Sequence, residues 1–367
     1  MMRVAGIMSG TSLDGVDVAI VDIGGRRVET VAHLSVAYPG ALRKRILAVS
    51  DTTCQTRDIS RLSFELGEVY GKAVTRTCRV HRIAIETVQL IACHGQTIYH
   101  EGKGRRPNTM QIGEASVLAE SFGVPVVSDF RTRDMAAGGG GAPLVPLADL
   151  LLLHSPRRNR VALNIGGIAN ITVLPARLDG TGVVAFDTGP GNMVMDQLAA
   201  HASGGRLTLD RDGRLGARGH VNRALLDRLL GLKWFAQKPP KTAGREQFGT
   251  AFVADLLATG LLVEDLIATA TALTAAGIAR AVLEYAQGTE EVIAAGGGVH
   301  NPQLMAQLAA FLPGCRITTT AEFGIHPDAK EAVAFALLGW RTWRHKSGNL
   351  PSATGARHAV ILGKVTR

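Results

Sequence analysis

The feature that most constrains the fold of this chain is a strand, glycine turn, strand pattern that occurs twice. The first copy joins an apolar strand at residues 4–8 to a β-branched strand at residues 16–23 through the turn at residues 10–15. About 155 residues later, a second apolar strand enters the turn at residues 164–170 and returns as a strand at residues 171–174. We interpret the two hairpins as parts of two related lobes, each contributing one glycine loop. Two hairpins that resemble each other by coincidence would give the same pattern.

Strands and helices alternate along the rest of the chain. The hydrophobic spacing predicts helices at residues 59–79, 112–122, 302–311 and 329–343, and short buried strands at residues 90–93, 124–127 and 291–295. This alternation favours an α/β fold with mixed sheets. The run from Ala136 to Pro143 contains four successive glycines and predicts a hinge or a ligand loop near a lobe boundary.

Composition excludes several classes of protein. Of 367 residues, 46% are hydrophobic and only 19% are charged, which excludes a disordered chain or a coiled coil. The 43 glycines are not periodic, so the chain is not collagen-like. The four cysteines lack the short spacing of a metal knuckle or redox pair, and we expect reduced thiols in the cytoplasm. We expect no signal peptide, because residues 1–22 contain no basic segment followed by an apolar run and a cleavage site. We expect no membrane span, because charged residues interrupt the longest apolar region, 251–282.

The formal net charge of +9 fits nucleic acid, a membrane surface or an anionic small substrate. Nucleic acid is the weaker choice, because the basic residues are scattered and only 5% of the residues are aromatic. A surface charge that only keeps the protein soluble explains the same excess.

The glycine loops have the composition of a nucleotide site. The first turn offers hydroxyls and unhindered backbone N–H groups to phosphate oxygens, and Asp14 or Asp17 could hold Mg²⁺ directly or through water. This turn is not a P-loop, because it lacks the lysine and is followed by a strand, and a plain hairpin turn would look the same. A third glycine loop, at residues 296–298, follows a strand and precedes a helix, where it could accept an adenine.

A candidate general base stands in the segment 186–192. Asp187 follows an apolar strand predicted at residues 183–186, so the sequence places a carboxylate where a strand ends and a loop begins. A positioned base of this kind contributes roughly 10²- to 10⁴-fold to a rate. The alternative is that Asp187 caps the helix that begins near Met193.

Four further polar residues are candidates for a functional site: His94 and Gln96 could contact a sugar, Arg131 could contact a substrate carboxylate, and Glu331 stands beside them as a candidate. His94 and Gln96 follow a buried strand, although a lone histidine is often only a hydrogen-bonded core residue. Arg131 could bind a substrate carboxylate through two N–H groups or belong to a surface ion-pair network. Glu331 lies in the first turn of the last long helix, where a negative charge is favourable in any case.

Taken together, these segments resemble the anhydro-N-acetylmuramic acid kinases. The resemblance runs nearly from end to end and rests on residues 6–17, 93–97, 129–131, 137–146, 164–172, 186–192, 239–246, 296–298 and 330–335. It implies the two-lobed actin-like (ribonuclease H-like) ATPase fold of the sugar kinase, actin and heat-shock chaperone superfamily, each lobe a mixed sheet flanked by helices around a nucleotide cleft. The expected lobes are residues 1–134 completed by 344–367, and residues 135–343.

The resemblance also implies the reaction. ATP, water and 1,6-anhydro-N-acetylmuramic acid would give N-acetylmuramic acid 6-phosphate and ADP, in peptidoglycan recycling. The chain would then be a cytoplasmic phosphotransferase with an alcohol group as acceptor, using ATP and Mg²⁺, and a homodimer with no nucleic-acid or membrane partner.

The same resemblance assigns roles to individual residues. Asp187 would be the catalytic base, while His94, Gln96, Arg131 and Glu331 would lie near the sugar. The nucleotide would be bound by Gly10, Thr11, Ser12, Leu13, Asp14, Gly15, Val16, Asp17, Gly166, Gly167, Gly296, Gly297 and Gly298.

Two positions depart from the family pattern. Gly140 stands where a polar residue, often Gln, is expected, and Gly249 follows Phe248 where Asn is common. Three other functions stay open: an ordinary hexose or amino-sugar kinase, in which Asp187 would deprotonate a sugar hydroxyl; a non-catalytic nucleotide-dependent regulator; and a nucleic-acid-binding protein.

Overall fold

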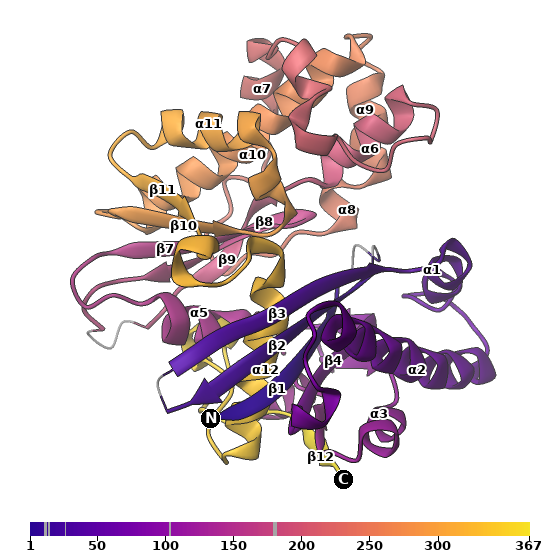
Figure 1. Ribbon diagram of the computed structural model, residues 1–367. Helices are drawn as coiled ribbons and strands as arrows, with labels where there is room; N and C mark the ends of the chain where they lie inside the picture. The colour runs from indigo at the N-terminus through magenta and orange to yellow at the C-terminus, as the bar shows by residue number, and fades with distance from the viewer. Residues whose placement is uncertain (11–12, 14, 26, 103, 179–181) are drawn as a thin grey trace. The chain divides into compact units, whose positions relative to one another are not determined.

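The chain folds into two compact units. The computed structural model describes residues 1–10, 13, 15–25, 27–102, 104–178 and 182–367. The first unit is Met1–Leu152 together with Gly324–Arg367, and the second is Leu153–Phe323. Each unit contains one mixed β-sheet flanked by helices (Figure 1), which confirms the predicted α/β fold class.

The boundary between the units differs from the one expected. Residues 135–152 and 324–343 were expected in the second lobe, but they belong to the first unit. The reason is that α12 (Lys330–Trp343) packs directly on β1 (Met2–Ser9). At Gly6 the strand and the helix approach so closely that an added Cβ would lie 2.0 Å from the carbonyl oxygen of Ala332.

The sheet of the first unit has the strand order β12-β6-β4-β1-β2-β3, with β5 paired to β4. Strands β1 and β2 form the first predicted hairpin, in antiparallel register from Met2 opposite Ile23 to Met8 opposite Asp17. Strand β4 lies parallel to β1, which makes the sheet mixed. The remaining strands are β2 (Gly15–Gly24), β3 (Arg27–Ala37), β4 (Leu90–Glu101), β5 (Asn108–Ile112), β6 (Val126–Ser128) and β12 (Lys364–Thr366).

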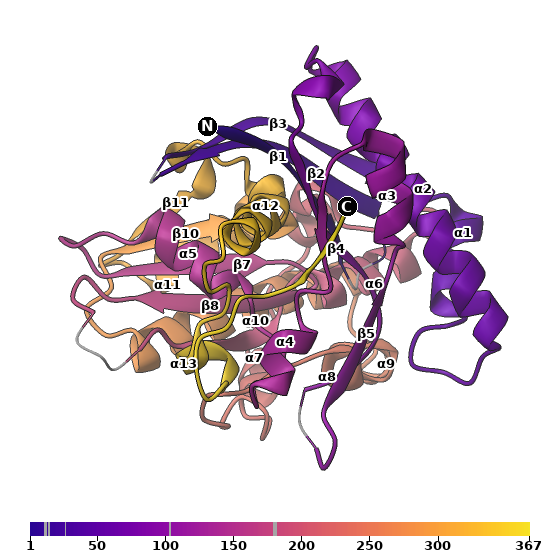
Figure 2. The ribbon, with the colours of Figure 1, turned by 90° about the horizontal axis from the view of Figure 1, so that it is seen from below.

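Alternating side chains of this sheet face two separate hydrophobic cores, as the period of a strand requires. On β1, Val4 and Met8 pack with α12, whereas Ala5 and Ile7 belong to the core on the opposite face. Figure 2 shows the sheet between α12 and the pair α2 and α3. The helices of this unit are α1 (Gly40–Leu47), α2 (Thr56–Val80), α3 (Ala115–Phe122), α4 (Thr132–Ala136), α5 (Val145–Leu153), α12 and α13 (Pro351–Thr354).

The sheet of the second unit has the order β11-β10-β7-β8-β9. Strands β7 (Arg160–Ile165) and β8 (Ile168–Leu174) form the second predicted hairpin, with Ile165 opposite Ala169 next to the turn. Strand β10 lies parallel to both β7 and β11. The remaining elements are β9 (Ala185–Pro190), β10 (Glu291–Ala295), β11 (Arg316–Thr319), α6 (Met193–Ala202), α7 (Arg223–Leu230), α8 (Arg245–Phe248), α9 (Thr250–Leu257), α10 (Val263–Tyr285) and α11 (Pro302–Phe311).

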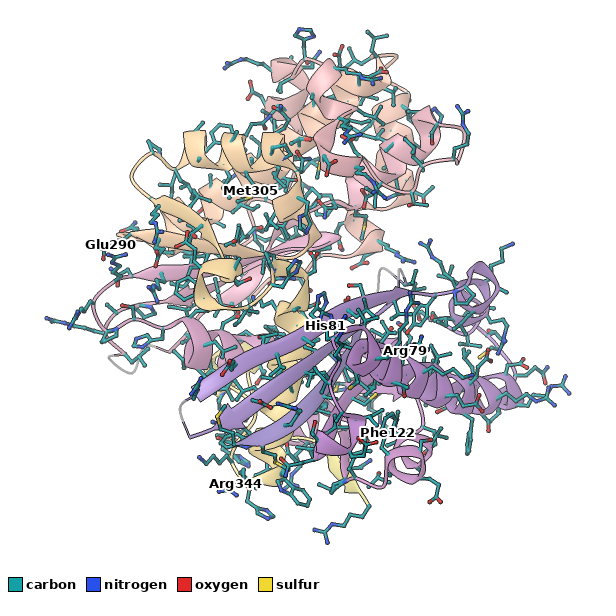
Figure 3. The ribbon with its side chains drawn as sticks, viewed as in Figure 1. Arg79, His81, Phe122, Glu290, Met305 and Arg344 are labelled. Carbon is teal, nitrogen blue, oxygen red and sulfur yellow. The ribbon has the colours of Figure 1, made fainter. Side chains whose placement is uncertain are left out.

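Helix α10 is the central helix of the second unit. Among the described residues it alone is long and apolar enough to cross a membrane by length and composition, but 83% of its most apolar window is buried within the protein. It packs against β8, β9, α6, α7 and α11. Figure 3 shows the side chains between helices and sheets; the labelled Phe122 and Met305 pack against the cores of the first and second units, respectively.

Candidate active site

Asp187 is a partly buried residue in the middle of β9, not at the end of a strand as the sequence predicted. It lies opposite Asn170 on β8, and pairing with β8 continues through Gly189 to Pro190. The Gly-Pro-Gly sequence that follows Thr188 is typical of a loop, yet Gly189 keeps the strand paired with a φ of +141°, a region that glycine adopts without strain. The structure therefore presents the carboxylate from a hydrogen-bonded strand.

The segment 241–243 holds Asp187 from the other side. The backbone N–H of Asp187 donates to the carbonyl of Lys241 (3.1 Å), and its carboxylate Oδ2 accepts from the N–H of Ala243 (2.8 Å). Burial raises the pKa of Asp187 to about 6, and the charge of Glu246 adds to this, while the Ala243 hydrogen bond and Lys241 oppose it. Such a carboxylate is mostly ionised at neutral pH yet more basic than an ordinary aspartate, as a general base requires.

The alternative role of Asp187 as a helix cap is wrong. Helix α6 begins at Met193 with Asn192 at its N-cap position, and no side chain caps it. The two oxygens of Asp187 are thus not engaged by that helix, and the carboxylate is held by segment 241–243 instead.

The glycine loops of the second unit come together in space. The carbonyls of Gly166 and Gly167, in the β7–β8 turn, accept the N–H groups of residues 191–193 at the start of α6. The loop after β10 lies against the same hairpin, because a Cβ on Gly296 would lie 2.7 Å from the carbonyl oxygen of Ile165. A Cβ on Gly298 would lie 2.2 Å from Cγ2 of Ile165. The absence of side chains therefore permits the close packing of these loops.

The first glycine turn is described only in part. Thr11, Ser12 and Asp14 lie outside the described residues. Gly10 follows β1, and its carbonyl accepts the N–H of Leu13, a buried residue with a φ of +60°. The other expected residues of this loop, Gly15, Val16 and Asp17, begin β2.

Asp17 is the described carboxylate closest in sequence to this turn. Its Oδ1 accepts a hydrogen bond from the hydroxyl of Ser35 and lies 3.7 Å from Nε2 of His33. Within the described ranges, no three His, Cys, Asp or Glu residues are grouped as metal ligands. Magnesium in nucleotide sites is typically held by one or two carboxylates together with phosphate oxygens and water, so the partly exposed Asp17 carboxylate fits that ion.

His94 and Arg131 form a hydrogen-bonded pair in the first unit. Nε of Arg131 donates to Nε2 of His94 (3.0 Å), and Nδ1 of His94 faces the carbonyl of Gly95 (2.8 Å). Burial and the neighbouring guanidinium hold the pKa of His94 well below its usual value, which agrees with a neutral ring that donates from Nδ1. Nη1 of Arg131 donates to the carbonyl of Gly141, so the plane of the guanidinium is fixed at two points.

Glu331 lies in the first turn of α12, as predicted. Burial raises the pKa of Glu331, the charges of Lys330 and Arg131 lower it, and that of Asp17 raises it. Within the first unit, the charges of Arg131 and Asp17 therefore both act on Glu331. A favourable interaction between the charge of Glu331 and the dipole of α12 is compatible with the same position.

The side chain of Gln96 is hydrogen-bonded within the first unit. It is 1% exposed; its Oε1 accepts from the hydroxyl of Ser9 and its Nε2 donates to the carbonyl of Thr97. The hydroxyl of Ser9 is also bonded to that of Tyr38 (2.7 Å). Gln96 therefore anchors the end of β1 directly before the first glycine turn.

The two departures from the family pattern differ in their surroundings. A Cβ on Gly140 would meet its nearest atom, the carbonyl oxygen of Ala142, at 3.4 Å, so this position has room for a side chain. A Cβ on Gly249 would lie 2.2 Å from the carbonyl oxygen of Arg245. This backbone between α8 and α9 is therefore specific to glycine.

Sequence reasoning missed the residues that hold Asp187. Lys241, Ala243 and Trp234 are not among the predicted site residues, although residues 239–246 belong to the segments that carry the resemblance. A lysine between two prolines and an Ala-Gly pair was the available signal, but nothing in the sequence connects it with position 187.

Known proteins match nearly the whole length of this chain. A family model described as anhydro-N-acetylmuramic acid kinase matches residues 2–367. An anhydro-N-acetylmuramic acid kinase of Caldanaerobacter subterraneus subsp. tengcongensis is 41% identical, with 99% of this chain and 96% of the relative covered. One of Bacillus cereus is 40% identical, with 100% and 99% covered. Among solved structures, (R)-2-hydroxyglutaryl-CoA dehydratase component A of Acidaminococcus fermentans has a TM-score of 0.47 at 14% identity, over 93% of this chain and 98% of its own.

Proposed function

This chain belongs to the anhydro-N-acetylmuramic acid kinase family, and on that premise we propose that Asp187 is the base of its reaction. The protein is a kinase that opens the 1,6-anhydro ring of 1,6-anhydro-N-acetylmuramic acid and phosphorylates O6 at the expense of ATP. The products are N-acetylmuramic acid 6-phosphate and ADP.

The chemistry needs one base rather than two carboxylates. A hydrolase that opened the C1–O6 bridge would protonate O6 with one carboxylic acid and activate water with another carboxylate. In this kinase the γ-phosphoryl group takes the place of the proton on O6. Asp187 removes a proton from water, the water oxygen bonds to C1, the C1–O6 bond breaks, and O6 bonds to phosphorus as the bond to ADP breaks.

The observation that carries this proposal is the environment of the Asp187 carboxylate, which sets its pKa and its orientation. It is partly exposed, its pKa is raised to about 6 by burial, and it is held by the N–H of Ala243. A carboxylate of this kind is ionised at neutral pH, accepts a proton readily and keeps a fixed direction.

Binding of the sugar is assigned to the first unit. Two of the five guanidinium N–H groups of Arg131 donate to His94 and Gly141, which fixes the guanidinium, and we propose that its other N–H groups bind a substrate carboxylate. We assign Glu331 to a sugar hydroxyl. His94, held neutral by its surroundings, acts by orienting Arg131 rather than as an acid.

Binding of ATP is assigned to the glycine loops. We propose that the loop at residues 10–17 and the turn at Gly166 and Gly167 bind the phosphates of ATP, and that residues 296–298 bind its adenosine. Asp17 would hold Mg²⁺ directly or through water, and that ion would neutralise phosphate charge when bound. We further propose that the protein works as a cytoplasmic homodimer in peptidoglycan recycling and has neither nucleic acid nor membrane as partner.

A coupled assay of ADP release tests this function. The protein is offered 1,6-anhydro-N-acetylmuramic acid, N-acetylmuramic acid or glucose at equal concentrations. We expect ADP release and a 6-phosphate product with the anhydro sugar, and rates lower by at least about 100-fold with the open sugars, because these lack the C1–O6 bond whose opening requires the base. A faster reaction with an open sugar would instead identify an ordinary hexose or amino-sugar kinase.

A further inference from the structure

A buried lysine stands behind the segment that holds Asp187. Lys241 is only 7% exposed, although lysines are rarely buried without a partner. Its Nζ lies 4.4 Å from the centre of the Trp234 ring and 3.4 Å from the carbonyl oxygen of Phe235. A cation on the face of a tryptophan is a favourable arrangement whose value increases with burial.

Trp234 contacts two successive residues of segment 241–243. Its ring lies under the ammonium group of Lys241, and its indole N–H donates to the carbonyl of Thr242 (3.1 Å). The ring itself is fixed by edge-to-face contacts with Phe235 and Phe248. This end of segment 241–243 is therefore attached to the aromatic core of the second unit.

The opposite side of the same segment contacts Asp187. The carbonyl of Lys241 accepts the N–H of Asp187, and the N–H of Ala243 donates to its carboxylate. Each of the three residues 241–243 thus contacts Trp234 or Asp187, and Lys241 contacts both. Movement of Lys241 away from Trp234 would shift the donor that orients Oδ2.

The charges around the lysine come from several elements. Glu246 on α8 raises the pKa of Asp187, and Lys241 lowers it. Burial and Arg280 on α10 lower the pKa of Lys241 itself, whereas Glu284 on α10 and Asp187 raise it. Lys241 is therefore a cation whose field favours the ionised form of Asp187.

We propose that Lys241, seated on Trp234, is a positioning residue for the reaction: it holds segment 241–243 so that Ala243 orients the Asp187 carboxylate, and its charge favours the ionised carboxylate. The proposal deepens the function proposed above and rests on Asp187 as the base. It assigns Lys241 no contact with substrate.

The test compares four variants of the full-length protein. Lys241→Met removes the charge but keeps the length of the side chain, and Lys241→Gln keeps a donor for the carbonyl of Phe235. Lys241→Arg keeps the cation for the tryptophan ring. Lys238→Met is the matched control, because Lys238 lies three residues away, is exposed and loses the same formal charge. ADP binding and circular dichroism verify that each variant is folded.

Two readouts are measured. The first is kcat and both KM values between pH 5 and 9. The second is the pKa of Asp187, followed by ¹³C NMR of protein labelled at the aspartate side-chain carboxyl carbons, with the resonance assigned by its loss in Asp187→Asn. We expect Lys241→Met and Lys241→Gln to raise that pKa by about one unit. The ionised fraction at pH 6 then falls from about one half to about one tenth, so kcat at pH 6 falls about fivefold relative to kcat at pH 8.5, while the KM values stay within about twofold.

Lys241→Arg should keep most of the native pH profile, and Lys238→Met all of it. The proposal is overturned if the neutral Lys241 variants titrate like Lys238→Met, or if Lys241→Arg behaves like Lys241→Met. The two readouts test the roles of Asp187 and Lys241 separately. Turnover in Asp187→Asn would refute the base assignment, whereas an unchanged Asp187 pKa in the neutral variants would refute only the role of Lys241.

Discussion

Asp187→Asn should stabilise the protein at neutral pH while it removes turnover. Folding raises the pKa of this carboxyl from the ordinary 3.8 to about 6, so folding favours its protonated form. The protonated carboxyl therefore contributes to the free energy of unfolding. This contribution is complete below about pH 4 and is lost as the pH rises through 6. Above about pH 7, ionisation of the buried carboxyl therefore costs the native protein about 3 kcal/mol, from about 1.4 kcal/mol for each pKa unit.

Asparagine does not ionise, and its side-chain oxygen can still accept from Ala243. The gain in the free energy of unfolding should accordingly be about 1.5 kcal/mol at pH 5 and about 3 kcal/mol at pH 8. Urea unfolding followed by tryptophan fluorescence measures it, since Trp234 lies beside segment 241–243. In a coupled assay, kcat should fall by roughly 10²- to 10⁴-fold, while ADP affinity stays unchanged.

Two results would refute this reasoning. If Asp187→Asn raised the free energy of unfolding equally at pH 5 and pH 8, burial would not penalise ionisation of the carboxylate. Near-normal turnover by Asp187→Asn would mean that another group removes the proton from water.

Three further substitutions test other contacts. Arg131→Ala should raise the KM for the sugar about 10- to 100-fold, because a charged hydrogen bond to the substrate is lost, and leave the KM for ATP within about twofold. Equal increases of both KM values in steady-state assays would show that Arg131 is not a sugar contact. Gly298→Ala places a methyl group against Ile165 and should weaken ATP binding at least about tenfold, whereas Gly314→Ala, which has open space around it, should leave calorimetric affinity unchanged; similar affinities would contradict the close packing. Gln96→Leu should lower the free energy of unfolding by about 1–3 kcal/mol, because it leaves a buried hydroxyl without its acceptor; an unchanged urea midpoint would count against that anchor.

The local elements could be predicted because their signals are local. The helix predicted at residues 302–311 is α11, with Asn301 capping it and Pro302 at its first position. The strand at residues 291–295 and the two hairpins have the expected limits to within a few residues. In each case the β-branched or helix-forming residues agree with the tertiary structure.

The boundary between the units could not be read from the sequence. Helix α12 is buried around most of its surface, so its hydrophobic pattern does not indicate which sheet it covers. Helix α12 belongs to the first unit because it contacts Gly6, more than 300 residues earlier in the chain. Neither composition nor hydrophobic spacing predicts such a contact.

The candidate site was predicted by residue type but not by environment. Asp187 stands out by its sequence context, yet burial and Glu246 raise its pKa while Ala243 and Lys241 lower it, and folding brings all three residues to it from a later segment. Gln96 has the residue type of a sugar contact, and only the structure places it against Ser9. Hydrogen bonds between residues far apart in the chain could therefore not be predicted from the local sequence.

The central claim is that water opens the anhydro ring while O6 takes the phosphoryl group. The most direct measurement is mass spectrometry of the product formed in ¹⁸O-water during a short reaction, beside a control in which finished product stands in ¹⁸O-water for the same time. The account predicts one ¹⁸O atom on C1 of the sugar, beyond the control, and none in the phosphoryl group. Unlabelled sugar 6-phosphate, or label that appears only in inorganic phosphate, would contradict it.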